Sequence, residues 1–280
     1  MWSRVRMPTP GGRSRRLASP IRAIFVYRPG AIGDTILTLP ALAALRQRYP
    51  GCRITFAGNT AMLPLLPIEQ ALSADDRRLL PLFGEPPRPW PGADLHVVFA
   101  RQPAGLPGIQ RDPLAAVERG RHVADWLVEA IDEDWPEREP QLEVEAGEGA
   151  PLVIHPGAGS AAKRWPEARF NALVRQLALP LAVVRGPADP PFDIEGAYER
   201  WDNLPLPELA RRLKGSGLFV GNDSGITHLA AAVGMPTLAI YVTTDPAIWG
   251  VRGAHTRRLQ SDVGVAAAAA AAGELLQVLG

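Results

Sequence analysis

The sequence predicts an α/β protein with two domains, each built on a parallel β-sheet. Two observations lead to this prediction: short apolar runs alternate with amphipathic stretches along the chain, and the alternation starts twice, near residue 23 and again near residue 152. Continuous apolar runs of this kind are typical of parallel strands buried on both faces. With 280 residues, the chain is long enough for two such domains.

The first half is expected to form a small βαβ domain. Its strands are the apolar runs at residues 23–27, 53–57 and 95–99. The residues after Asp34 have the apolar spacing of a helix, in which Pro40 must lie early or cause a kink. Residues 122–131 are amphipathic and are expected to form another helix.

The second half repeats the alternation after residues 133–150, which are rich in acidic residues, proline and glycine, as an interdomain linker would be. Its expected strands are residues 152–154, 181–184, 218–220 and 237–241. Its expected helices lie near residues 166–178, 207–214 and 226–234. The predicted parts of the chain are a basic tail over 1–22, an N-terminal domain over 23–145, a C-terminal domain over 146–264 and an alanine-rich C-terminal helix over 265–280.

Composition narrows the class of protein. A hydrophobic fraction of 46% and a charged fraction of 21% describe a soluble globular protein, and a net charge of +1 predicts no general affinity for nucleic acid. No apolar run reaches the roughly 18 residues that span a bilayer. The single cysteine, Cys52, forms no internal disulfide and fits a reducing compartment. Six arginines and no acid in residues 1–22 predict a disordered tail or, as the functional alternative, a contact with an anionic membrane face.

Two polar, glycine-containing turns point to phosphate binding. They are residues 155–160, His-Pro-Gly-Ala-Gly-Ser, and residues 221–228, Gly-Asn-Asp-Ser-Gly-Ile-Thr-His. Backbone N–H groups at the start of a helix attract anions, and Ser160 is expected either to donate to phosphate or to cap a helix. Lys163, one of only two lysines in the chain, is expected to neutralise charge on a departing diphosphate, with a solvated surface lysine as the alternative. Two such turns and a lysine suggest a nucleotide-sugar enzyme.

The second turn offers several polar groups with different expected roles. Ser224 and the Gly225 N–H are expected to hold phosphate, whereas like charge would keep Asp223 from it. Asp223 is expected to bind ribose hydroxyls or to brace the loop. His228 lies one turn into the expected helix and would donate to a diphosphate oxygen or a sugar hydroxyl, with a structural histidine as the alternative. His155 is expected to fix its loop rather than to react.

The loop of residues 28–34 follows the first expected strand. In it, Asp34 is expected either to cap a helix or to act as general base toward an acceptor hydroxyl. Gly30 and Gly33 would let the backbone approach a ligand. Because ligands lie at the carboxyl ends of strands in such sheets, two facing domains would place this loop on one wall of a cleft and the two phosphate turns on the other.

Other chemistries are not favoured. No histidine, cysteine or acidic side chains occur at a recognised metal-ligand spacing, and no Gly-x-Ser-x-Gly elbow is present. The fingerprint Gly-x-Gly-x-x-Gly is also missing, which disfavours an NAD-dependent oxidoreductase.

Three segments resemble glycosyltransferase family 9, the ADP-heptose:lipopolysaccharide heptosyltransferases and their relatives. They occur in the family's order: residues 28–42, residues 155–160 followed by Lys163-Arg-Trp-Pro, and residues 221–236, of which the third is the most specific. The resemblance implies a GT-B fold, in which two Rossmann-like domains with parallel sheets face a central cleft. It also implies an inverting, metal-independent transfer without a cofactor.

The resemblance implies roles for single residues. Asp34 is similar to the proposed base and Lys163 to the lysine at the diphosphate. The acceptor-side loop contributes Arg28, Gly30 and Gly33. The expected donor-binding residues are Gly157, Gly159, Ser160, Lys163, Asp189, Asp223, Ser224, Gly225 and His228. Asp189 departs from the family, because it is a shorter substitute for a glutamate that contacts the ribose.

The predicted function is transfer of a sugar, by the resemblance a heptose, from an ADP-sugar donor to a hydroxyl of a cell-surface or lipid-linked glycan. The expected location is the cytoplasm, at the inner face of the cytoplasmic membrane. Two alternatives stay open. A GT-B nucleotide-sugar epimerase would act on the donor alone, and a non-catalytic nucleotide-sugar-binding protein would bind ADP without turnover.

Overall fold

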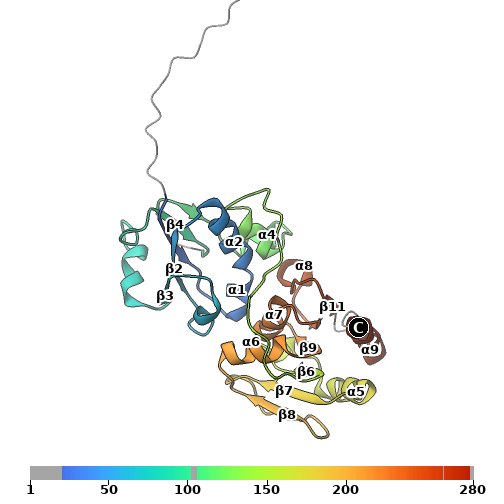
Figure 1. Ribbon diagram of the computed structural model, residues 1–280. Helices are drawn as coiled ribbons and strands as arrows, with labels where there is room; N and C mark the ends of the chain where they lie inside the picture. The colour runs from blue at the N-terminus through green and yellow to red at the C-terminus, as the bar shows by residue number, and fades with distance from the viewer. Residues whose placement is uncertain (1–20, 102–105, 261, 278–280) are drawn as a thin grey trace, which may run out of the picture.

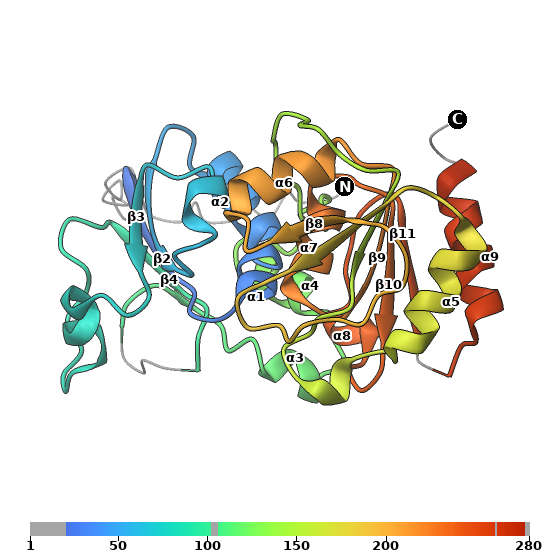
Figure 2. The ribbon, with the colours of Figure 1, turned by 90° about the horizontal axis from the view of Figure 1, so that it is seen from below.

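The computed structural model describes residues 21–101, 106–260 and 262–277 of the chain. Most of the expected basic tail, residues 1–20, therefore lies outside the described residues. The described chain forms two α/β halves that lie side by side, coloured blue to green and yellow to red (Figures 1 and 2). Each half is built on one sheet whose strand pairs are all parallel, as the sequence predicted.

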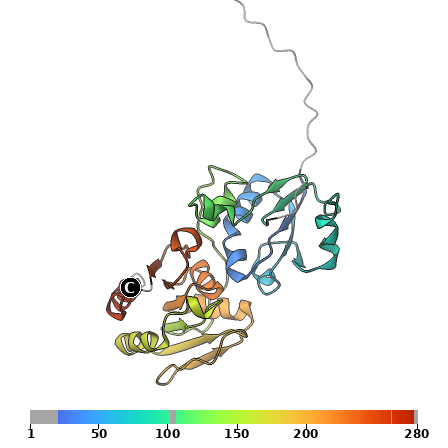
Figure 3. The same cartoon turned by 180° about the vertical axis from the view of Figure 1, so that it is seen from behind.

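The N-terminal sheet has the strand order β3-β2-β1-β4-β5 among the described residues. Its strands are β1 (Ala23–Tyr27), β2 (Arg53–Gly58), β3 (Gln70–Ser73), β4 (Leu95–Val98) and β5 (Ile109–Gln110). The helices of this half are α1 (Ile32–Ile36), α2 (Leu39–Arg48), α3 (Ala115–Glu118) and α4 (Val123–Val128), with the 3₁₀ helices η1 (Leu63–Leu65) and η2 (Arg77–Phe83). The helix η2 lies on the side of this half away from the C-terminal sheet (Figures 1 and 3).

The C-terminal sheet has the order β11-β10-β9-β6-β7-β8. Its strands are β6 (Leu152–His155), β7 (Leu181–Arg185), β8 (Glu199–Asp202), β9 (Leu218–Asn222), β10 (Thr237–Tyr241) and β11 (Thr256–Gln260). Its helices are η3 (Ala161–Lys163), α5 (Glu167–Leu177), α6 (Leu206–Lys214), α7 (Gly225–Ala232), α8 (Pro246–Trp249) and α9 (Val265–Gln277). The last helix, α9, packs beside α5 on the outer face of this sheet (Figure 2).

Sequence reasoning missed four strands, β3, β5, β8 and β11, which are the outer strands of the two sheets. Outer strands are covered less completely, so they lack the continuous apolar run that identifies a central strand. The strand β8 begins with exposed Glu199 and Arg200, and β11 carries exposed Arg257 and Arg258.

Two helix predictions also need correction. The expected helix after Asp34 is broken into α1 and α2, and Pro40 lies at the second position of α2. A proline is tolerated there because the first turn of a helix needs no backbone N–H donor. The helix expected over 122–131 is shorter, since α4 ends at Val128.

One apolar cluster joins the two halves. It includes Val26 and Leu42 from the N-terminal half and Val153, Leu209 and Leu229 from the C-terminal half. At the cleft side of this junction, the N-termini of α1 and α7 meet so closely that a Cβ on Gly225 would lie 2.6 Å from Cβ of Ile32. Only glycine fits at that distance, so the starts of the two helices pack in direct contact.

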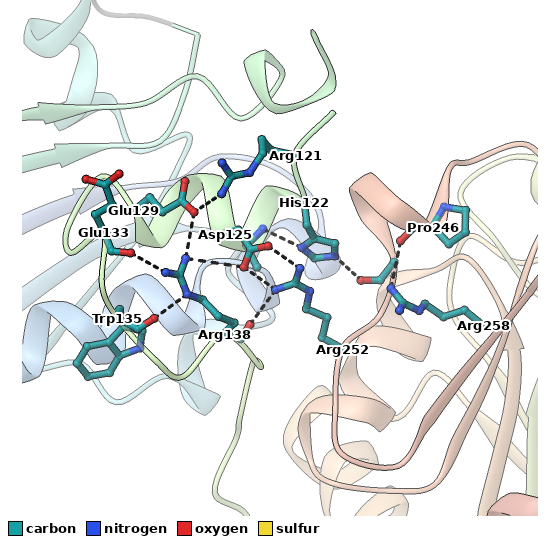
Figure 4. A network of polar contacts seen from close by, with 12 residues as sticks. Arg121, His122, Asp125, Glu129, Glu133, Trp135, Arg138, Pro246, Arg252 and Arg258 are labelled. Atoms are coloured by element: carbon teal, nitrogen blue, oxygen red, sulfur yellow. Dashed lines mark hydrogen bonds and ion pairs between the residues drawn. The ribbon is translucent and has the colours of Figure 1, made fainter. Parts of the chain in front are cut away.

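A polar network, here called the clasp, makes a second contact between the halves (Figure 4). Nη1 of Arg252 donates to Oδ1 of Asp125 in α4 at 2.7 Å, and Nη2 donates to Oδ2 at 2.7 Å. Nε2 of His122 lies 2.8 Å from the carbonyl oxygen of Gly250, and its Nδ1 accepts from the N–H of Ala124. Nε2 therefore carries the proton. Burial, with nearby Arg252, lowers the pKa of His122 to about 4, so the ring is neutral near pH 7.

Across the described ranges, no helix combines the length and the apolar composition that crossing a membrane requires.

Candidate functional site

Two adjoining cavities lie between the halves, at the carboxyl ends of the central strands. The smaller has a volume of about 350 Å³ and the larger about 710 Å³, and they share Ala31, Gly159, Ser224 and Gly225. The smaller cavity is lined by Ala31, Gly33, Asp34, Leu37, Gly159, Lys163, Asp223, Ser224, Gly225, His228, Thr244 and Trp249. It is thus bounded by both predicted walls.

On the N-terminal wall, Asp34 lies in the first turn of α1 with both carboxylate oxygens engaged. Oδ1 accepts from Nη2 of Arg28 at 2.6 Å, and Oδ2 accepts from the N–H of Ala31 at 2.9 Å. Gly30 has φ = +129°, and a Cβ there would lie 2.6 Å from Oδ2. The turn therefore needs glycine for its backbone angle and for the space that the carboxylate occupies.

On the C-terminal wall, Nζ of Lys163 lies 2.8 Å from Oδ2 of Asp223. The lysine ends η3, and the aspartate follows β9. Asn222 connects these two segments, because its side chain donates to the carbonyl oxygen of Pro156 at 2.7 Å and accepts from the N–H of Trp165 at 2.9 Å. The amide of Asn222 thus ties both ends of the loop 156–165 to the end of β9.

The two ion pairs are buried in opposite senses. The Arg28 side chain is 6% exposed and its partner Asp34 is 29% exposed. In the other pair, Lys163 is 37% exposed and its partner Asp223 is 7% exposed. The N-terminal wall therefore presents a carboxylate to the cavity and the C-terminal wall presents an ammonium group, each paired with a more deeply buried counterion.

His228 lies between the two pairs. It is buried in α7, next to Gly33 of the opposite wall. Burial lowers the pKa of His228 although the carboxylates of Asp223 and Asp34 oppose this shift. The neutral imidazole retains one N–H donor for a ligand in the cavity.

The larger cavity is mostly apolar, with Val184, Trp201 and Leu206 among its lining residues. A hydrogen-bonded chain forms its polar side: Oδ2 of Asp189 lies 3.0 Å from Nε2 of His155, and Nδ1 of His155 lies 3.0 Å from Oγ of Ser224. Burial of Asp189 is the largest influence and opposes its ionisation, but His155, the N–H of Gly186 and nearby Arg164 together outweigh it, and the pKa of Asp189 is lowered. An apolar cavity with one polar side suits a nucleoside.

Ser224 has a structural task as well as a place on the cavity wall. Its Oγ caps α7 by accepting from the N–H of Thr227 at 3.3 Å. The same Oγ also lies 3.0 Å from Nδ1 of His155 and 3.0 Å from Oγ1 of Thr227, so the hydroxyl is engaged within the protein. The free donor at the start of α7 is therefore the backbone N–H of Gly225.

The structure gathers most of the expected site residues. Nine of the thirteen line the two cavities: Gly33, Asp34, Gly159, Lys163, Asp189, Asp223, Ser224, Gly225 and His228. The other four do not: Arg28 lies behind Asp34, Gly30 lies beneath its carboxylate, Gly157 is buried, and Ser160 is exposed at the start of η3. The binding and catalytic roles of all thirteen stay predictions.

Sequence reasoning missed several lining residues. Trp249 and Thr244 border the smaller cavity, and Ile32 and Asn59 border the larger. Thr244 lies in the turn that follows the predicted strand 237–241. Its place at the carboxyl end of a central strand could have identified it as a lining residue. Nothing local in the sequence indicates that Trp249, at the end of α8, borders this cavity. Among the described residues, no group of three or more histidine, cysteine or acidic side chains is arranged to hold a metal ion.

Comparison with known proteins gives a consistent set of similarities. The family model described as glycosyltransferase family 9 (heptosyltransferase) matches residues 202–270. Lipopolysaccharide heptosyltransferase 1 of Pseudomonas aeruginosa is 27% identical over 300 residues, covering 85% of this chain and 84% of that protein. The family match contains the turn 221–228, and the relative extends the similarity to most of the chain.

Two solved structures share the arrangement of both halves. The glycosyl transferase family 9 protein from Veillonella parvula has a TM-score of 0.75 at 18% identity, covering 93% of this chain and 99% of that one. The ADP-heptose lipopolysaccharide heptosyltransferase II of E. coli has a TM-score of 0.72 at 19% identity, covering 92% of this chain and 99% of that one. At these identities, the two structures establish a shared fold.

Proposed function

The protein is a glycosyltransferase of the family 9, heptosyltransferase-like type with a GT-B fold, and we propose that it transfers a heptose from ADP-heptose to a glycan hydroxyl with inversion at the anomeric carbon. The observation that carries this proposal is the pair of opposite charges on the two walls. A carboxylate faces the smaller cavity from the N-terminal side, and an ammonium group faces it from the C-terminal side.

The C-terminal wall suits the donor. The diphosphate would lie between Lys163 and the start of α7, where the Gly225 N–H and the His228 ring are available. Lys163 has three N–H donors, and its bond to Asp223 leaves two for phosphate oxygens. The nucleoside would occupy the larger, apolar cavity, with Asp189 at its polar side.

The N-terminal wall suits the acceptor. Asp34 would accept the proton of the acceptor hydroxyl as the oxygen forms its bond to the anomeric carbon. The bond from that carbon to the diphosphate oxygen breaks at the same time, and the negative charge moves onto ADP, where Lys163 stabilises it. Because base and diphosphate lie on opposite walls, the oxygen attacks from the face opposite the leaving group, which gives inversion. No metal ion or cofactor takes part in this scheme.

The names of the relatives support the choice of donor and acceptor. The similar protein from Pseudomonas aeruginosa is a lipopolysaccharide heptosyltransferase, and the E. coli structure is an ADP-heptose lipopolysaccharide heptosyltransferase. By this analogy the acceptor is a lipid-linked glycan, and the enzyme would meet it at the inner face of the cytoplasmic membrane. Nucleic acid is not an expected partner.

The test is a transfer assay with ADP-heptose and a lipopolysaccharide core acceptor, followed by ADP release and product mass. ADP release that depends on the acceptor is the expected result. Conversion of the donor without an acceptor would indicate an epimerase, and ADP binding without any turnover would indicate a binding protein. Melting curves with ADP, UDP and GDP identify the nucleotide, since a ligand that prefers the folded state raises the melting temperature.

A further inference from the structure

Arg28 does not line either cavity, yet it is among the most buried charged residues of the described chain, at 5% exposed. Burial of a guanidinium group is costly unless it is paired and hydrogen-bonded. The question is therefore what this buried charge does behind the cleft.

Three strands of the N-terminal sheet hold Arg28 in place. It directly follows β1, its backbone N–H donates to the carbonyl oxygen of Ala57 in β2 at 2.9 Å, and its Nη1 lies 3.4 Å from the carbonyl oxygen of Phe99 just after β4. Its Nη2 donates to Asp34 at 2.6 Å, and its Nε has no partner among the described residues. The strongest contact of the guanidinium group is therefore the one to Asp34.

Asp34 is correspondingly restricted to one orientation. Arg28 holds Oδ1, the N–H of Ala31 holds Oδ2, and the backbone of Gly30 lies against the carboxylate. The side chain nevertheless remains 29% exposed toward the smaller cavity. Each carboxylate oxygen has a second lone pair that these contacts leave available for a substrate hydroxyl.

We propose that Arg28 is a positioning residue, which acts on the reaction through Asp34 and touches neither substrate. It fixes the carboxylate in the orientation that receives the acceptor proton, and it offsets the negative charge that a bound diphosphate adds to the cleft. This inference rests on the proposed function. A purely structural role explains the geometry poorly, because a buried ion pair adds little net stability compared with an apolar pair of similar size.

The test is a kinetic cycle of wild type, Arg28→Met, Asp34→Asn and the double variant. Arg28→Met should lower kcat about 100-fold, as expected when a reacting group is misplaced by about 1 Å, and leave the KM for the donor within about twofold. In the Asp34→Asn background, the same change should have no further effect on kcat, because the group it positions is already removed. Arg46→Met is the matched control, since Arg46 is held by Cys52, Pro67 and Glu69 within the N-terminal half and lines neither cavity.

A milder variant covers the case in which Arg28→Met fails to fold. Arg28→Lys keeps the charge and loses the forked donor, and should lower kcat about tenfold in the wild-type background and have no further effect in the Asp34→Asn background. Equal losses of kcat in the wild-type and Asp34→Asn backgrounds would overturn the proposal, as would full activity of either Arg28 variant.

Crystal structures of the Arg28 variants require no turnover, so they test the positioning role independently of the proposed function. In a crystal structure of Arg28→Met or Arg28→Lys, the Asp34 carboxylate should leave the N–H of Ala31. An unmoved carboxylate would refute the positioning role even for an active enzyme. If the wild type transferred no sugar from any ADP-sugar, the proposed function would fail, while the orientation of Asp34 would still be decided by the crystal structure.

Discussion

The two ion pairs of the cleft are alike in chemistry and opposite in burial. In the N-terminal half the cation is buried and the anion faces the cavity, whereas in the C-terminal half the anion is buried and the cation faces it. A buried counterion fixes its partner without competing for the ligand. The comparison teaches that the two walls differ in the sign of the exposed member rather than in the presence of an ion pair, and this sign is the basis of the proposed assignment of donor and acceptor.

Local structure explains the difference. Arg28 follows a central strand, and its long side chain bends back to the ends of β1 and β4, so the shorter Asp34 side chain on α1 reaches the cavity. Lys163 ends the short helix η3, and Asp223 follows buried β9 directly. Each exposed charge thus lies on a short helix, Asp34 in the first turn of α1 and Lys163 at the end of η3, and each buried counterion lies at the end of a central strand.

The largest expected effect comes from removing the exposed anion. Asp34→Asn keeps the size of the side chain and should lower turnover by about 10²- to 10⁴-fold, the usual contribution of a general base. Calorimetric titration with ADP should give the wild-type affinity within about twofold, because the proposed diphosphate site lies on the other wall. Turnover within tenfold of wild type would remove Asp34 from the role of base.

Removing the exposed cation should affect binding more than structure. Lys163→Met should weaken ADP binding about 10- to 100-fold, the value of a hydrogen bond to a charged group. Lys214→Met is the matched control, because Lys214 is the other lysine of the chain and lines neither cavity of the site. Equal ADP affinities for the two variants in calorimetry would contradict the assignment of the C-terminal wall to the donor.

The two charged walls can act on one ligand only if the halves stay at a fixed distance. Variants of the clasp test whether this contact maintains that distance. Asp125→Asn and Arg252→Gln should each lower stability, with a coupling energy of about 1–2 kcal/mol in a double-mutant cycle. Small-angle scattering should show a larger radius of gyration for both variants. Arg46→Gln with Glu69→Gln, an ion pair within one half, should change stability without changing the radius. An unchanged radius in the clasp variants would show that the apolar junction alone sets the spacing.

The effect that is smallest near neutral pH concerns the pH dependence of the clasp. His122 has a folded pKa of about 4, below its ordinary value of 6.5, so the unfolded chain binds the proton more readily. Stability should therefore be full above about pH 6.5 and fall toward pH 4, at a slope of up to about 1.4 kcal/mol per pH unit from this group. Burial also lowers the pKa of His96 and His228, which adds to the same trend. In denaturant titrations, His122→Gln should reduce the slope; an unchanged slope would assign the acid sensitivity elsewhere.

The sequence predicted the central strands of both sheets and none of the outer ones. Runs such as residues 23–27 and 237–241 are recognisable because burial on both faces selects continuous apolar residues. The strands β8 and β11 have one neighbouring strand each and carry charges, so their position follows from pairing with β7 and β10 rather than from their own composition.

The sequence predicted those site residues that lie in short motifs. Asp34, Lys163, Asp223 and His228 were found because each lies in a glycine-containing turn or beside one. The pairing of Arg28 with Asp34, the chain from Asp189 through His155 to Ser224, and the contribution of Trp249 depend on distances between segments far apart in sequence. No local pattern encodes such distances.

The amide of Asn222 has a consequence for how the molecule moves. Because one side chain bonds both ends of the loop 156–165 to the end of β9, we expect that loop and the turn 221–228 to move together. Superposing nucleotide-free and nucleotide-bound crystal forms on the C-terminal sheet should leave these segments coincident. The displacement should instead be a rotation of the entire N-terminal half about the point where α1 meets α7.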